Sequence, residues 1–93
     1  MEIEFDEAKR ARILEERGLD IAQVGTLFDG FHLTRRDNKP SETEERFHSI
    51  GMIGDDVVIV TWTPREDRRR IVTMWKANDR ERQKYQQARD RPG

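Results

Sequence analysis

The chain contains no cysteine, which excludes a disulfide framework, a thiolate metal site and a cysteine nucleophile. Long apolar runs are missing too, and none approaches the roughly 20 residues that a membrane-spanning helix needs. The N-terminus lacks the apolar segment of a secretory signal, so the cytosol is the expected location. Only 33% of the 93 residues are hydrophobic and 40% are charged. We therefore expect one small domain over residues 1–93, whose core a binding partner can help to complete.

Several catalytic motifs are also absent. The six glycines form neither a GxGxxG pattern nor a phosphate-binding loop, and no serine lies in a GxSxG elbow. ATP chemistry and serine hydrolysis are therefore set aside. His32 and His48 are 16 residues apart, without an HExxH motif. Scattered histidines are more typical of strand or surface positions than of metal ligands, so we expect no metal site and no cofactor.

What the chain has in abundance is charge, and the two signs are separated along the sequence. Residues 1–60 carry fourteen acidic and eight basic side chains, whereas residues 61–93 carry five acidic and ten basic ones. A basic surface that includes Trp62, Trp75 and Tyr85 suits a phosphate backbone with stacked bases. An acidic protein partner explains the pattern equally well, as does a solvated strand followed by a helix with many salt bridges.

Hydrophobic periodicity predicts an α+β domain. Residues 3–5 alternate as a short strand, Asp6 then caps a helix that ends at Gly18, and Asp20 caps a second helix that ends at Gly30. After a polar loop at 35–44 and turns at 54–56 and 64–67, the alternating segments that predict strands are 31–34, 45–53, 57–63 and 68–76.

The final helix is predicted by a capping pair, Asn78 and Glu81, and covers residues 79–89. It has too few apolar residues to be held by burial alone, so it lies on the sheet edge, meets a partner or frays. The expected architecture is a two-helix hairpin packed on a curled antiparallel sheet of three to four strands, with the other face of the sheet partly open.

Basic and hydroxyl side chains gather on the predicted strands. Strand alternation predicts one face with Arg70, Val72, Met74 and Lys76 and an opposite face with Ile71, Thr73 and Trp75. Cations without a metal can still cleave RNA: a base helps the 2′-hydroxyl to attack the adjacent phosphorus, and fixed cations stabilise the phosphorane-like transition state. The side chains of this kind are Arg46, His48, Thr61, Arg65, Arg70, Thr73 and Lys76.

The ordered residues resemble the BrnT family of small toxins from bacterial toxin–antitoxin pairs, which are similar in fold to the RelE ribonucleases. The resemblance spans nearly the whole chain. The matching pieces are Phe5-Asp6-Glu7-Ala8-Lys9, Arg17-Gly18-Leu19, Leu27-Phe28-Asp29, Glu45-Arg46-Phe47, Ile50-Gly51, Val57 to Thr63 with Arg65 and Asp67, Arg70-Ile71-Val72-Thr73, Lys76-Ala77-Asn78, Glu81-Arg82 and Tyr85.

The resemblance implies a metal-independent endoribonuclease that arrests translation. It also implies a ribbon-helix-helix antitoxin, similar to BrnA, that neutralises the toxin and carries it to operator DNA. Thr73 matches a position usually held by serine, and His48 is the candidate base. The basic family positions are matched by Arg46, Arg65, Arg70 and Lys76, and the candidate RNA-binding residues are Trp75, Arg69 and Arg80.

Two departures from the family pattern bear on activity. Glu16-Arg17-Gly18 stands where the family commonly has Lys-His-Gly, and Trp75-Lys76 stands where it commonly has a basic pair. A lost cation weakens transition-state stabilisation by about 2–4 kcal/mol if it acts like an oxyanion donor. Trp75 could instead stack a base, worth roughly 1–3 kcal/mol of binding, or serve as a core or interface aromatic. Two alternatives to the enzyme are a non-catalytic module that binds the antitoxin and represses the operon, and a plain nucleic-acid-binding domain.

Overall fold

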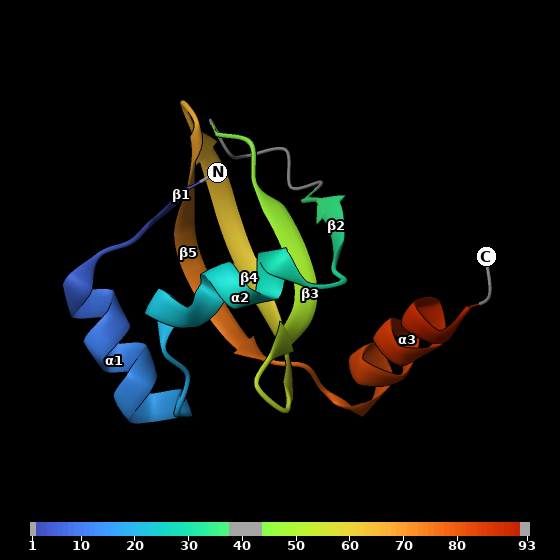
Figure 1. The fold of residues 1–93 in the computed structure, drawn as a ribbon. Helices are drawn as coiled ribbons and strands as arrows, with labels where there is room; N and C mark the ends of the chain where they lie inside the picture. The colour runs from blue at the N-terminus through green and yellow to red at the C-terminus, as the bar shows by residue number, and fades with distance from the viewer. Residues whose placement is uncertain (1, 38–43, 92–93) are drawn as a thin grey trace.

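The computed structural model describes residues 2–37 and 44–91, and residues 38–43 of the predicted polar loop lie outside that description (Figure 1). In chain order the elements are β1 (Glu2–Glu4), α1 (Glu7–Arg17), the 3-10 turn η1 (Ile21–Gln23), α2 (Val24–Asp29), β2 (Leu33–Arg36), β3 (Phe47–Ile53), β4 (Asp56–Arg65), β5 (Arg68–Lys76) and α3 (Asp79–Asp90). The predicted α+β class, helix hairpin and C-terminal helix are confirmed.

The strands form one mixed sheet in the order β1-β5-β4-β3-β2. Four strands form an antiparallel meander, as predicted, but β1 adds a fifth strand that runs parallel to β5. This pairing joins the two ends of the sequence, residues 2–4 with 68–70, so no local pattern could indicate it.

The helix boundaries follow the predicted caps. The side chains of Asp6 and Asp20 each accept a hydrogen bond from a backbone N–H two residues on, at 2.8 and 3.0 Å. Gly18 ends α1 in the left-handed region with φ 67°, where a side chain would be strained. Asn78 and Glu81 form the reciprocal capping box at the start of α3.

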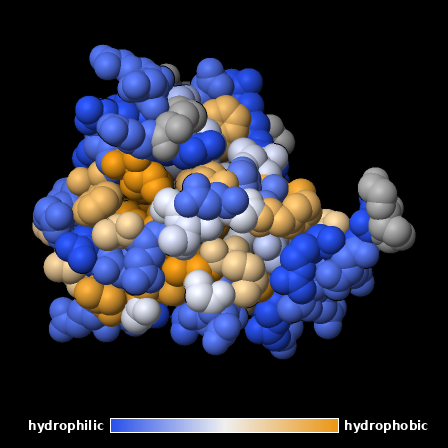
Figure 2. All heavy atoms as spheres, in the orientation of Figure 1, coloured by the Kyte–Doolittle hydropathy of each residue, from blue (hydrophilic) through white to orange (hydrophobic). Residues whose placement is uncertain are grey.

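The core lies on one face of the sheet, beneath α1, η1 and α2 (Figure 1). At Gly51 on β3, a Cβ atom would lie 2.8 Å from Cγ of Leu27, so glycine lets α2 pack directly on the strand. Figure 2 shows apolar atoms gathered around these helices, whereas α3 is almost wholly hydrophilic. The buried core members are Ile13, Leu19, Ile21, Val24, Leu27, Ile53, Val58, Val60, Trp62, Ile71 and Met74.

A β-bulge in β5 changes which residues share a face. Thr61 pairs with Thr73, but Trp62 pairs with Ile71, which leaves Val72 as the extra residue. Ile71 and Met74 are consequently both in the core, although they are three residues apart. Before Val72 the odd-numbered residues of β5, such as Ile71, face the helices. After Val72 the even-numbered residues, such as Met74, face them instead.

The bulge overturns the predicted faces of β5. Arg70 pairs with Thr63, which points away from the helices, whereas Lys76 pairs with Val58, which belongs to the core. Directly paired residues of antiparallel strands project to the same side of a sheet. The prediction that Arg70 and Lys76 share a face is therefore wrong.

Helix α1 covers the edge of β5 beyond the reach of β1. The ammonium group of Lys9 donates to the Val72 carbonyl at 2.6 Å, and Arg17 donates to the Met74 carbonyl at 2.6 Å. These two side chains satisfy carbonyl groups that an open sheet edge would leave to water or to another strand.

The C-terminal helix is held chiefly by Tyr85. Its ring is 2% exposed, it lies 5.7 Å from the ring of Phe31, and its hydroxyl donates to the Phe31 carbonyl at 2.9 Å. Most other side chains of α3 are exposed. Of the three predicted alternatives for this helix, the structure supports attachment beside the sheet.

Candidate active site

The face of the sheet opposite α1 and α2, here called the open face, is ordered in rows by the strand register. The polar row consists of Arg35, His48, Thr61 and Thr73, and the neighbouring apolar row consists of Leu33, Ile50, Ile59 and Trp75. On the other side of the polar row, Thr63 and Arg70 form a pair.

A small cationic pocket surrounds that last pair. It has a volume of about 130 Å³. The charged and hydroxyl groups that line the cationic pocket are Lys9, Arg46, Arg65, Arg70 and Thr63, together with the acids Asp6 and Glu44. With four cations against two carboxylates, the cationic pocket suits an anionic ligand such as a phosphate.

The cations are oriented by neighbouring acids. Arg70 donates to Glu4 of β1 at 3.0 Å, and Arg65 lies 3.8 Å from Glu44. The parallel strand β1 thus brings a carboxylate beside β5 that holds the Arg70 guanidinium in place. About half of the Arg65 side chain and one third of the Arg70 side chain remain exposed to solvent.

His48 lies in the polar row within a hydrogen-bonded chain. Its Nε2 is 3.2 Å from Asp37 and its Nδ1 is 2.9 Å from the Thr61 hydroxyl. Because a carboxylate only accepts, we assign the ring proton to Nε2, which leaves Nδ1 to accept from Thr61. The imidazole side chain is 22% exposed, so a ligand on the open face can reach it.

A groove of about 460 Å³ lies beyond the polar row, between the sheet and α3. Its lining includes the whole apolar row, and Tyr85 and Lys84 contribute from α3. The ring of Trp75 meets that of His48 edge-on, with centroids 6.2 Å apart. We call this feature the α3 groove.

The structure therefore brings together three of the predicted catalytic residues, Arg46, Arg65 and Arg70, and places His48 and Thr73 in the adjacent row. Lys76 lies apart, six residues along β5 from Arg70 and 3.8 Å from Asp56. Trp75 lines the α3 groove. Arg80 is exposed in the first turn of α3.

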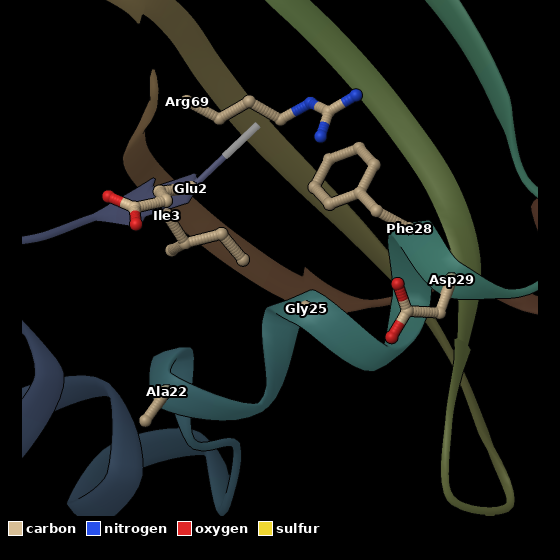
Figure 3. Close-up of a pocket in the computed structure, with 7 residues that line it drawn as sticks. All are labelled: Glu2, Ile3, Ala22, Gly25, Phe28, Asp29 and Arg69. Carbon is tan, nitrogen blue, oxygen red and sulfur yellow. The ribbon is translucent and has the colours of Figure 1, made fainter. Parts of the chain in front are cut away.

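Arg69 lies on the helix-covered side, away from the cationic pocket. Its guanidinium is 3.9 Å from the ring centroid of Phe28 and 5.0 Å from that of Trp62, and Figure 3 shows it extended across Phe28 above a groove of about 520 Å³. Burial lowers the pKa of Arg69, and its Nε has no hydrogen-bond partner among residues 2–37 and 44–91. Arg69 therefore packs against the two aromatic rings through cation–π contacts and does not line the cationic pocket.

Three contributors were not predicted from the sequence: Lys9, Asp37 and Arg17. Lys9 reaches the cationic pocket from α1, and Arg17 donates to the Thr73 hydroxyl at 3.2 Å. Lys9 and Arg17 contact β5, which is more than fifty residues away in sequence, and Asp37 contacts His48 of the neighbouring strand, so no local spacing marks any of the three. One indication of these contributors was present in the sequence: Arg17 lies in the Glu16-Arg17-Gly18 segment that departs from the pattern of the resembled family.

Neither a metal centre nor a membrane span is found in the described part of the chain. No group of three or more histidine, aspartate or glutamate side chains there could hold a metal ion. No helix there is long and apolar enough to cross a membrane.

Comparison with curated proteins finds no match to the chain. A family model does match, over residues 5–81, and it describes the ribonuclease toxin BrnT of type II toxin–antitoxin systems. The matched range contains β5, most of the open face and every residue of the cationic pocket. The chain belongs to the BrnT family of ribonuclease toxins.

Proposed function

We propose that the protein is a metal-independent endoribonuclease that arrests translation, with the cationic pocket as its phosphate site. The observation that carries the proposal is the convergence, in one pocket of a BrnT-family chain, of Arg46, Arg65 and Arg70 with Lys9, which reaches the pocket from α1. Guanidinium groups hold phosphate oxygens through paired hydrogen bonds and stabilise the added negative charge of the transition state.

In the proposed reaction, the 2′-hydroxyl attacks the adjacent phosphorus and the bond to the 5′-oxygen breaks, which leaves a 2′,3′-cyclic phosphate and a 5′-hydroxyl that takes its proton from water. His48 is the candidate base. Its Nδ1 accepts the 2′-hydroxyl proton in place of the Thr61 hydrogen bond, and Asp37 stabilises the imidazolium that forms.

The test is cleavage of a single-stranded RNA by the purified protein in the presence of EDTA. We expect products with cyclic phosphate ends, and no cleavage of the same RNA carrying 2′-O-methyl groups. Cleavage that requires a divalent metal, or that persists on the 2′-O-methyl substrate, would contradict the proposed mechanism. Growth arrest on expression without a partner is the expected cellular counterpart.

The family is one of toxin–antitoxin systems, and we propose a ribbon-helix-helix antitoxin that covers the open face. An acidic or amphipathic segment laid over Arg65 to Lys84 matches the local charge and blocks the path of RNA. Operator DNA is then bound only by the toxin–antitoxin complex. Co-purification should weaken as salt is raised, and RNA should compete with the antitoxin. A partner that binds only residues 1–30 and leaves cleavage intact would contradict this account.

A non-catalytic antitoxin-binding repressor is the second candidate. The observation that favours it is that Arg65 and Arg70 are already matched with Glu44 and Glu4, while both ring nitrogens of His48 are occupied. A repressor of this kind would leave RNA intact even at equimolar protein, yet would still raise operator affinity together with the antitoxin. The cleavage assay decides between the two.

A further inference from the structure

The chemistry of the open face changes in one direction. The cationic pocket comes first, the polar row of Arg35, His48, Thr61 and Thr73 follows, and the apolar row of Leu33, Ile50, Ile59 and Trp75 comes last. Successive rows are two residues apart along a strand, about 7 Å from the rise per residue. A nucleotide has the same order of parts: a charged phosphate, a hydroxylated ribose and a flat, largely apolar base.

We propose that the α3 groove is a binding site for a single nucleobase of an RNA strand whose neighbouring phosphate lies in the cationic pocket. The proposal rests on the proposed ribonuclease function and adds to it a second contact site for the same substrate. It also gives a role to Trp75, which lines this groove.

The α3 groove has the dimensions and lining that a base needs. Its volume of about 460 Å³ is within the range of small-ligand pockets. Trp75 and Ile59 give it an apolar floor from neighbouring strands, and stacking on an aromatic ring is favourable for every base. Among the charged lining residues, Glu81 accepts a hydrogen bond from the Asn78 N–H in the capping box, whereas Arg35 and Lys84 make no ion pair within the described residues. Both only donate hydrogen bonds, so they suit the carbonyl and ring-nitrogen acceptors of a base.

Helix α3 forms the outer wall of this site. The capping box sets where the helix starts, after a two-residue link from β5, and the hydrogen bond from Tyr85 to the Phe31 carbonyl fixes its far side. Tyr85 is the one buried residue of α3, and it lines the groove. A helix whose only other apolar residue is Ala88 is thus positioned by the aromatic side chain that closes the proposed base site.

The experiment measures binding of a short fluorescent RNA with 2′-O-methyl groups, which cannot be cleaved by 2′-hydroxyl attack. A matched RNA has one abasic position and keeps every phosphate. The parent protein should bind the intact RNA roughly 5- to 100-fold more tightly than the abasic one, as expected from the loss of one stacked base. Equal affinity for the two would overturn the base site.

Variants then assign the effect to residues. Trp75→Ala should weaken binding of intact RNA by the same roughly 5- to 100-fold and leave abasic RNA unchanged, whereas Trp75→Phe should restore most of the affinity. Arg70→Ala should weaken both RNAs by a common factor, because it contacts phosphate. Leu14→Ala is the apolar control: Leu14 is 45% exposed on α1, so this variant should bind like the parent.

The outcomes separate this proposal from the one it rests on. If Trp75→Ala and Trp75→Phe both bind intact RNA like the parent, the base site is wrong while the ribonuclease proposal stands. If the parent binds no RNA, both are wrong. Binding of an acidic peptide that depends on Trp75, without RNA binding, would assign the groove to a protein partner instead. Should Trp75→Ala fail to fold, the intact and abasic RNAs on the parent still decide.

Discussion

The two faces of the sheet are built by the same strands but are stabilised in different ways. On the helix-covered face, Val58, Val60 and Trp62 of β4 pack beneath α1 and α2 in the hydrophobic core. On the open face, the alternating residues of β4 change from apolar to hydroxyl-bearing toward Thr63, where ion pairs replace apolar packing. Stability and ligand binding should therefore be separable, even at adjacent residues.

Arg69 and Arg70 test that separation most directly, because they are neighbours on opposite faces. Arg70→Ala should reduce kcat by about 10²–10³-fold, as for the loss of one donor to transition-state charge. The free energy of unfolding should change by less than about 1 kcal/mol, since the Glu4 pair is partly exposed. Cleavage kinetics and thermal denaturation measure the two effects.

Arg69→Ala is the matched variant and should do the reverse. It removes a guanidinium that lies over Phe28 and near Trp62, so we expect a loss of roughly 1–2 kcal/mol of stability. Its kcat should stay within a few-fold of the parent. Equal loss of activity in the two variants would show that the faces are not functionally distinct.

Two glycines probe how tightly the helix-covered face is packed. At Gly51→Ala the new Cβ would lie 2.8 Å from Cγ of Leu27, so strain of about 1–3 kcal/mol should lower the melting temperature. Gly25→Ala is the control, because its Cβ would meet only Cδ1 of Ile3 at an ordinary 3.7 Å. In helix α2 that change should be neutral or stabilising by up to about 1 kcal/mol. A stable Gly51→Ala protein would mean that α2 can move away from β3.

Asp20 offers a smaller, pH-dependent test within the helix layer. Hydrogen bonding to Arg10 at 2.7 Å, and then to the Ala22 N–H, lowers the pKa of Asp20 below its ordinary value of 3.8. The stabilisation is therefore complete above about pH 3.8 and is lost as pH falls through the lowered folded-state pKa. Urea denaturation at several pH values should show the parent approaching Asp20→Asn in stability as acid is added. A difference in unfolding free energy between the parent and Asp20→Asn that stays constant down to pH 2 would contradict this assignment. Asp20→Ala should cost about 1 kcal/mol more stability than Asp20→Asn, because it also removes the helix cap.

How far the sequence predicts this molecule depends on the range of the interaction. The helix ends at Gly18 and Asn78 follow from contacts within a few residues, and the sequence predicted them. The parallel pairing of β1 with β5 joins segments more than sixty residues apart, and no local signal reveals it.

The same distinction applies to the site. The sequence identified the arginines of the cationic pocket through their residue types and the family resemblance. It missed Lys9 and Asp37, because each acts across elements that only the folded chain brings together. It also misplaced Lys76, because the bulge at Val72 depends on pairing between strands, and strict alternation is the only inference that a single strand allows.

Lys76 gives the smallest expected effect and the sharpest check on the bulge. Strict alternation places it on the same face of β5 as Arg70, in which case Lys76→Ala should abolish cleavage. The register instead pairs it with Val58 on the helix-covered side, and its 3.8 Å contact with Asp56 is about half exposed at both ends. We therefore expect Lys76→Ala to retain cleavage within a few-fold and to change stability by no more than about 0.5 kcal/mol.

Asp56→Ala should change stability equally little, because an exposed pair contributes little and neither partner depends on it for folding. A Lys76→Ala protein that is folded but inactive would show that a cation on the helix-covered side acts in catalysis. The separation of the two faces would then fail at this end of β5.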